Sequence, residues 1–286
     1  MTGGLKERLF NKGGAGIPRG ELWISGAVLR ELGLPLKQES FIALSAGIGA
    51  DLCFFSYTGP VQNIPAGSAE MERNIKKAHD RGLLCGVTVD GPFQRAVKEH
   101  GFIEIMRGFY DGARLEKYIA AGTAPAAAEL QAAEKAGADL LILCDDIAYS
   151  RGLYFSPRQF AAKILPFYHQ LRDSVKETTL GFHSDGKVEP VLDSLLAAGF
   201  SVFSLEPEAM NLIDLARAFP AGTILLSGIK SEWLLGAFSP ADLPGEEIIR
   251  YVDDLKSNCN LILASLCGLT DVNGLNRLKE LYKLFA

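Results

Sequence analysis

The sequence has few cysteines and histidines and no long apolar run. Its 286 residues include 5 cysteines and 4 histidines. The cysteines are scattered, without a Cys-x-x-Cys pair, which excludes a disulfide-dense mini-protein and favours a reduced, cytoplasmic setting. No apolar stretch approaches the ~20 residues that cross a bilayer, so no membrane association is expected. The charged N-terminal residues are not followed by an apolar segment, and no secretory signal is therefore expected.

The sequence also lacks an excess of basic residues. Its formal net charge is −5, which argues against nucleic-acid binding by neutralisation of phosphates. Hydrophobic residues make up 48% of the chain and charged residues 22%, as in ordinary globular proteins, which excludes disorder and collagen-like structure. Because no linker or low-complexity tract interrupts the chain, residues 1–286 are predicted to form a single domain.

Short apolar runs alternate with amphipathic stretches along the whole chain. Buried parallel strands, covered on both faces, have this continuous apolar character. Eight strands with intervening helices predict an α/β fold, a (β/α)8 TIM barrel, whose typical size of ~250 residues suits this chain. The alternative is an open doubly wound sheet, although no Gly-x-Gly-x-x-Gly follows the first run. The eight predicted strands are 21–25, 51–56, 83–89, 140–144, 179–183, 201–205, 223–227 and 261–265.

Polar side chains that suit metal binding follow several of these runs. His183 and Asp185 come at the end of 179–183, Glu206 follows 201–205, and Cys267 follows 261–265. Since a barrel enzyme carries its chemistry at the carboxyl ends of its strands, these groups would meet at one mouth. Such side chains bind zinc or a similar divalent ion. Each residue alone has a simpler explanation, namely a buried thiol, a turn or a helix cap.

Other residues at the same strand ends are candidates for catalysis or substrate binding. Asp90 and Asp146 are the predicted catalytic carboxylates, acting as acid, base or ligand. For the adjacent Asp145–Asp146 pair, capping of the next loop or pairing with Arg151 is an equal alternative. An apolar wall for an aromatic substrate is predicted, although packing explains its residues equally well: Trp23, Tyr57, Phe93 and Tyr149.

Three longer segments resemble a known family. They read DDIAYSRGLYFSPRQFAAKILPFYHQL, GFHSDGKVEPVLDSLLAAGF and SLEPEAMNLIDLA, and VTVDGPFQRA resembles a turn of the same family. The resemblance is to the uroporphyrinogen decarboxylase superfamily, most strongly to its corrinoid-dependent methyltransferase branch, over roughly residues 80–275. It implies a (β/α)8 barrel, as the pattern of apolar runs does.

The resemblance also implies a set of zinc ligands. The methyltransferase branch and the related cobalamin-independent methionine synthases bind Zn²⁺ through His-x-Cys after one strand and Cys after the last. In the methionine synthases a Glu lies between them. His183, Glu206 and Cys267 match this pattern, whereas Asp185 stands where the first Cys is found. Replacing a thiolate by a carboxylate leaves more positive charge on the metal, which favours polarising an oxygen over activating a thiol.

The resemblance therefore predicts a metal-assisted methyltransferase. It would move a methyl group between a small substrate, either a methoxy-aromatic or methyl ether or a thiol, and a corrinoid carried by a partner protein. A homodimer is considered as well. The first alternative is a decarboxylase of a tetrapyrrole, but the Arg-Gln-Ala-Gly-Arg motif of those enzymes is absent from ELWISGAVLRELG. The second alternative is a barrel that binds a ligand without turnover.

Overall fold

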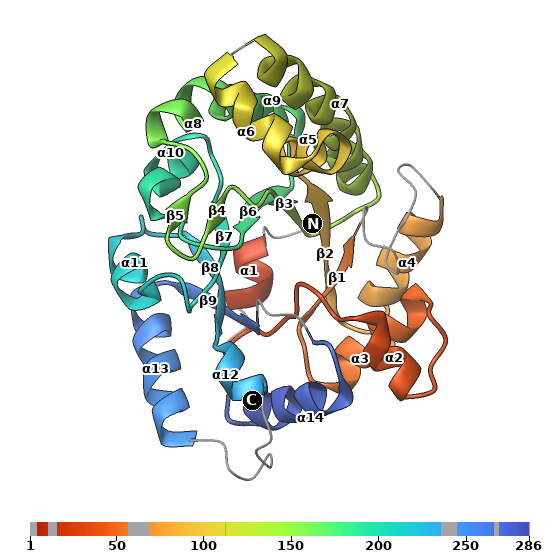
Figure 1. The fold of residues 1–286 in the computed structure, drawn as a ribbon. Coiled ribbons are helices and arrows are strands. Elements are labelled where there is room, and N and C mark those ends of the chain that lie inside the picture. Colours follow the sequence, from red (N-terminus) through yellow and green to blue (C-terminus); the bar gives the residue numbers. More distant parts are fainter. Residues whose placement is uncertain are drawn as a thin grey trace.

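The computed structural model of the chain describes residues 5–10, 16–56, 69–111, 113–235, 245–265 and 269–285. Seven parallel strands form one curled sheet in the order β1-β2-β3-β6-β7-β8-β9, with helices around its outer side (Figure 1). The strands are β1 (Leu52–Ser56), β2 (Leu84–Asp90), β3 (Leu140–Cys144), β6 (Thr179–Ser184), β7 (Val202–Leu205), β8 (Ile224–Ile229) and β9 (Asn260–Ser265). All seven lie where apolar runs predict strands.

The predicted first strand, 21–25, is not a regular strand. Only two isolated bridges occur in this region, Arg19 to Leu263 and Ile24 to Leu269. The backbone at residues 18–20 nevertheless contacts both edges of the sheet. Leu263 N–H donates to the Pro18 carbonyl at 2.7 Å, and the Arg19 carbonyl accepts from Leu52 N–H at 3.1 Å. The described residues thus form a curled seven-stranded sheet with an irregular segment between its edge strands, not a complete eight-stranded barrel.

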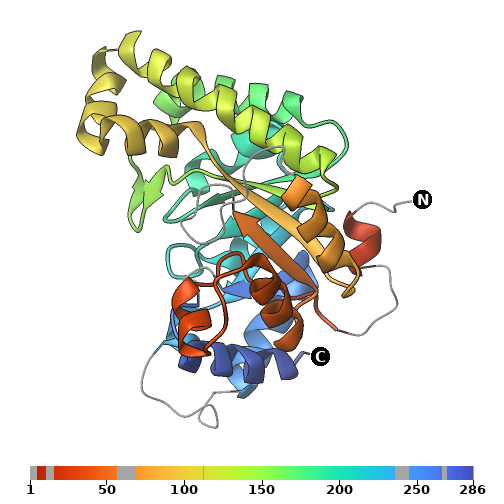
Figure 2. The same ribbon diagram turned by 90° about the vertical axis from the view of Figure 1, so that its right-hand side faces the viewer.

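Helices follow most strands and cover the outer face of the sheet (Figure 2). None of the helices in the described part of the chain is long and apolar enough to span a membrane. A two-stranded hairpin, β4 (Ala148–Tyr149) and β5 (Gly152–Leu153), follows β3. The helices are α1 (Leu5–Phe10), α2 (Gly26–Glu31), α3 (Gln38–Gly47), α4 (Ala69–His79), α5 (Pro92–His100), α6 (Phe102–Asp111), α7 (Ala113–Lys135), α8 (Pro157–Lys163), α9 (Leu165–Ser174), the 3₁₀ helix η1 (Glu189–Val191), α10 (Leu192–Ala197), α11 (Leu212–Ala218), α12 (Ser231–Leu234), α13 (Gly245–Asn258) and α14 (Val272–Lys283).

The apolar side chains divide into two clusters, one on each face of the curled sheet. The larger cluster joins the outer face of the strands to the helices. The smaller one fills the inner face with alternate strand residues, including Leu140, Ile142 and Leu226, and Leu5 of α1 packs into it. Cys144, the next inward residue of β3, packs against this inner cluster. Strand side chains alternate between the two faces of a sheet. Polar residues at the strand ends that continue the alternation of Leu140, Ile142 and Cys144 therefore also point to the inner side.

Candidate functional site

The strand register aligns four polar residues at the carboxyl ends of neighbouring strands. Asp90 of β2 pairs with Cys144 of β3, and Cys144 pairs with His183 of β6. His183 pairs in turn with Ser204 of β7. Paired residues of parallel strands have side chains on the same face, so the four lie in one row. The candidate site lies at this row of residues.

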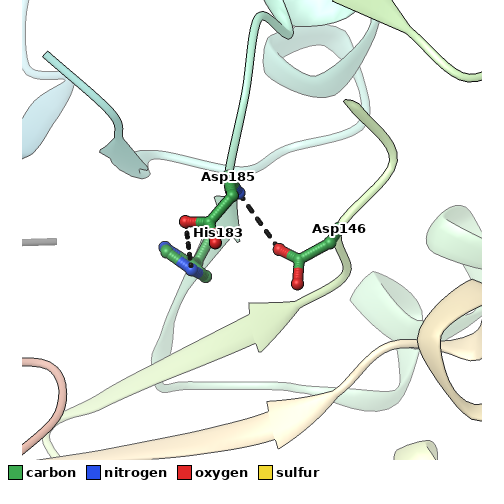
Figure 3. A group of neighbouring side chains, drawn as sticks. All are labelled: Asp146, His183 and Asp185. Carbon is green, nitrogen blue, oxygen red and sulfur yellow. Dashed lines mark hydrogen bonds and ion pairs between the residues drawn. The ribbon is translucent and has the colours of Figure 1, made fainter. Parts of the chain in front are cut away.

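Three side chains of the types that bind metal ions converge at that row, and His183 belongs to both. Ligand atoms of Asp146, His183 and Asp185 all lie within 4.8 Å of one another. His183 Nε2 is 3.7 Å from Asp185 Oδ1, and Asp185 N–H donates to Asp146 Oδ1 at 3.0 Å (Figure 3). Asp146 comes from the loop after β3, and the other two come from the end of β6 and the turn after it. The structure therefore brings together Asp146, His183 and Asp185 from the predicted set.

The His183 ring is held by a neighbouring hydroxyl. Its Nδ1 lies 3.0 Å from the Oγ of Ser204, which is fully buried. When Nδ1 carries the proton and donates it to Ser204, Nε2 is unprotonated and faces Asp185, which is the form of histidine that binds a metal ion. Ser204 was absent from the predicted site. Strand alternation offers a signal for it, because Ser204 lies two residues before Glu206 and so shares its face.

Glu206 fixes the turn that carries Asp185. Its Oε2 accepts a hydrogen bond from Gly186 N–H at 2.8 Å. Gly186 has a φ of +78°, and a Cβ there would lie 2.5 Å from the backbone nitrogen of Tyr149. Only glycine fits this close approach with that backbone conformation. The turn after β6 is thereby packed against the β4–β5 hairpin, while Glu206 lies next to the three-residue group and outside it.

Asp145 is enclosed and has a different role from Asp146. Its carboxylate accepts hydrogen bonds from Phe93 N–H and Gln94 N–H at the start of α5, and from Tyr168 Oη at 2.8 Å. Burial raises the pKa of Asp145 to about 7, although these hydrogen bonds lower it. Asp145 thus caps the start of α5, which precedes it in the chain, and not the next loop, as was expected from the sequence. Asp146 is the residue that faces the site.

The other predicted catalytic carboxylate, Asp90, lies at the end of β2 and is 9% exposed. Its Oδ2 forms an ion pair with Lys98 of α5. Its neighbour in the register, Cys144, is a free thiol. Burial raises the pKa of Cys144 well above the ordinary thiol value, and the charges of Asp146 and Asp90 raise it further. Asp90 is therefore balanced by a cation, and Cys144 is held in its protonated form.

The field around the three-residue group is negative. Loss of surrounding water raises the pKa of Asp185, His183 opposes this effect, and the charges of Asp146 and Glu206 add to it. The side chain of Asp185 is nonetheless 60% exposed, whereas that of His183 is 13% exposed. The group therefore presents partly exposed oxygen ligands around a sheltered imidazole, an arrangement that attracts a cation.

The predicted substrate-binding residues lie in different places. Tyr149, 46% exposed, is in the hairpin beside the site, and its ring stacks on Tyr154 at a centroid distance of 5.7 Å. Phe93 is 1% exposed and packs against Phe155 at 5.5 Å, within the aromatic core. Trp23, 43% exposed, lies in the irregular segment next to β9, across the sheet order from β3 and β6. Tyr57 and the predicted ligand Cys267 fall outside the described residues.

Comparisons with known proteins agree with this architecture. The uroporphyrinogen decarboxylase (URO-D) family model matches residues 72–283. A methyltransferase from Methanosarcina mazei is similar in fold, with a TM-score of 0.74 and 16% identity, covering 98% of this chain and 96% of that one. The comparison with curated proteins gives no match.

Sugar epimerases share the fold less closely. An L-ribulose 3-epimerase has a TM-score of 0.58 at 14% identity, covering 94% of this chain and 93% of that chain. A D-psicose 3-epimerase from Clostridium cellulolyticum H10 has a TM-score of 0.54 at 11% identity, covering 94% and 96%. At these identities the likeness shows a shared TIM-barrel-like fold, whereas the family model matches most of the chain. The chain belongs to the uroporphyrinogen decarboxylase (URO-D) family.

Proposed function

We propose that this protein is a metal-assisted methyltransferase that moves a methyl group between a small substrate and a corrinoid carried by a partner protein. The observation that carries the proposal is the convergence of Asp146, His183 and Asp185, whose ligand atoms lie within 4.8 Å of one another at the ends of β3 and β6. Family membership and the likeness of the whole chain to a methyltransferase fold support it.

The three side chains fit a divalent ion such as Zn²⁺. Tetrahedral zinc bonded at about 2.1 Å places its ligand atoms about 3.4 Å apart, near the 3.7 Å between His183 Nε2 and Asp185 Oδ1. The hydrogen bond between His183 Nδ1 and Ser204 orients the ring as metal-binding histidines require. Glu206 and Cys267 are proposed as further ligands or as neighbours that adjust the site. Three protein ligands with one open position are typical of catalytic zinc.

The residues of the chain would act around that open position. A metal held by one imidazole and carboxylates is a Lewis acid toward oxygen, and it would polarise a methylated oxygen of the substrate. Asp146 and Asp185 would hold the ion, and Asp90, balanced by Lys98, would orient the substrate or move a proton. The methyl acceptor would supply both electrons of the new bond, while the departing oxygen keeps those of the old one. Tyr149 and Tyr154 would exclude water from one side.

The negative charge at the candidate site disfavours a tetrapyrrole decarboxylase. A substrate with many carboxylates needs cations at the mouth, whereas Asp146, Asp185 and Glu206 supply negative charge there. Two basic side chains of α5 are already engaged, Arg95 with Glu129 and Lys98 with Asp90. A methyltransferase is therefore favoured over the decarboxylase.

The expected cytoplasmic location, the homodimer and the single-domain organisation of residues 1–286 stay predictions.

The test measures methyl transfer to or from the corrinoid directly. The metal-free and zinc-loaded proteins are incubated with methylcobalamin or Co(I) cobalamin and candidate thiols or methyl ethers, and the cobalamin absorbance spectrum is followed. A change that requires zinc, the protein and one substrate class is expected, and it should be lost in His183→Ala. Zinc binding without any change in the spectrum would favour the barrel that binds a ligand without turnover.

A further inference from the structure

Three aromatic rings form a row that includes Tyr149 of the hairpin beside the candidate metal site. Tyr149 stacks on Tyr154 with 16° between the ring planes, and Phe102 of α6 meets Tyr154 edge-on at 4.9 Å. Tyr149 and Phe102 are 46% and 39% exposed, although large apolar side chains are usually covered. In this aromatic row, Phe102, Tyr154 and Tyr149, the two outer rings are exposed and the middle one is partly buried.

The aromatic row is fixed against the acidic group. Tyr149 lies directly on the turn that carries Asp185, because its carbonyl accepts from Lys187 N–H at 2.9 Å and its backbone fills the space beside Gly186. Tyr154 is close enough to the carboxylates to be affected by them. Burial raises the pKa of Tyr154, and the charges of Asp146 and Asp185 raise it further. The hydroxyl of Tyr154 therefore lies within electrostatic reach of these carboxylates, and the backbone of Tyr149 packs on the turn that carries one of them.

The negative charge there exceeds what a metal ion would neutralise. Asp146, Asp185 and Glu206 contribute three carboxylates, and a divalent ion balances two of them. Two basic side chains near the group are paired elsewhere, Lys98 with Asp90 and Lys187 with Glu189 at 3.1 Å, and Arg151 in the hairpin turn is exposed. One negative charge would remain beside the exposed rings even with a metal bound. Anions would be repelled from this mouth, and cations would be attracted.

We propose that the substrate of this site is a small organic cation whose ammonium group lies against the aromatic row of Tyr149 and Tyr154. This inference rests on the proposed function and names its substrate class. Aromatic faces bind quaternary or protonated ammonium groups through their quadrupole, and adjacent carboxylates strengthen the attraction. The methylated oxygen of the same molecule would then reach the metal, so that recognition and chemistry use different ends of the substrate.

The probe is choline, which carries a quaternary ammonium group and the free hydroxyl that a demethylated ether would have. The comparison compound is 3,3-dimethylbutan-1-ol, which has the same shape without the charge. Calorimetric titration of the zinc-loaded protein is expected to show choline binding about tenfold more tightly. The difference should vanish in Tyr149→Leu and return in Tyr149→Trp. Tyr110→Leu, at an 88% exposed position on α6, serves as the matched control and should leave it unchanged.

The outcomes separate this inference from the proposed function. Equal affinity for choline and its neutral analogue would overturn the cation assignment, while zinc binding and methyl transfer to cobalamin would still be judged by their own assays. Choline binding that occurs only in the metal-free protein, and is abolished by zinc, would place the cation in the metal position and would also overturn it. Tighter binding of choline than of the analogue with zinc present, lost in Tyr149→Leu, supports the inference.

Discussion

Asp145 and Glu21 are two enclosed carboxylic acids that hold together two different junctions of the sheet. Asp145, 0% exposed, joins β3 to the start of α5 and to Tyr168. Glu21, 3% exposed, accepts from Ser265 N–H at 3.2 Å and from Tyr282 Oη at 2.7 Å. Burial raises the pKa of each to about 7 against the opposing effect of its hydrogen bonds.

The two junctions differ in what surrounds the acid. Around Asp145 the strands are regular, and its own N–H donates to the His183 carbonyl at 2.9 Å, so the acid supports the residues of the candidate site. Glu21 itself belongs to no regular strand among the described residues, and its side chain adds bonds to Ser265 of β9 where only isolated backbone bridges join the two segments. A buried carboxyl thus positions functional groups in one place and substitutes for backbone pairing in the other.

The largest expected effect is at the junction next to the site. Asp145→Ala removes the cap of α5 and the partner of the Tyr168 hydroxyl, and leaves buried donors unsatisfied. We expect a loss of about 3 kcal/mol in the free energy of unfolding, measured by urea denaturation. The adjacent Asp146→Ala is the control, since it should change zinc affinity with little loss of stability. Equal losses in both variants would contradict the division of roles.

The second prediction concerns pH and Glu21. Its pKa is about 7 in the folded protein against an ordinary value of 4.5, so the folded state holds the proton more tightly. The stabilisation is complete below pH 4.5 and is lost as the pH rises through 7, by about 3 kcal/mol. Glu21→Gln should lack this loss. Wild type and variant are compared by urea denaturation between pH 4.5 and 8, where Asp145 contributes equally to both. Parallel curves would show that Glu21 does not titrate this way.

A smaller loss of stability is expected when the tyrosine hydroxyl that donates to each of the two acids is removed. Tyr168→Phe and Tyr282→Phe each remove one hydroxyl donor from a buried carboxyl. Each should lower the free energy of unfolding by about 1 kcal/mol. Only Tyr168→Phe should also weaken zinc binding, because only Asp145 supports the strand end beside His183. Weaker zinc binding in Tyr282→Phe would show that the two junctions are coupled.

Much of the fold is predictable from the sequence because buried parallel strands are continuous apolar runs. The run 140–144 coincides with β3, and six other runs match strands within one or two residues. The run 21–25 has the same character but is not a strand. Its Glu21 is buried by side chains from β9 and α14, distant in the sequence. The hairpin of Tyr149 also went unpredicted, since its strands have only two residues each.

The strand-end residues of the candidate site were predictable from the sequence, whereas their hydrogen-bond partners were not. His183, Asp185 and Asp146 were all expected at the mouth, and the structure brings them together. The separate role of Asp145 depends on Phe93, 52 residues away in the chain, so no local pattern reveals it. The hydrogen bond of Ser204 to His183 likewise depends on the register of β6 with β7. Register and long-range contacts, rather than residue types, determine these roles.

The central claim is that Asp146, His183 and Asp185 hold a metal ion. Calorimetric zinc titration of the metal-free protein tests it most directly, with His183→Ala, Asp185→Ala and Asp146→Ala as variants. His169→Ala, at an exposed position on α9, is the control. We predict one zinc ion per chain in wild type and His169→Ala, with binding weakened more than about tenfold by each variant at the site. Equal, weak binding in all five proteins would contradict the claim.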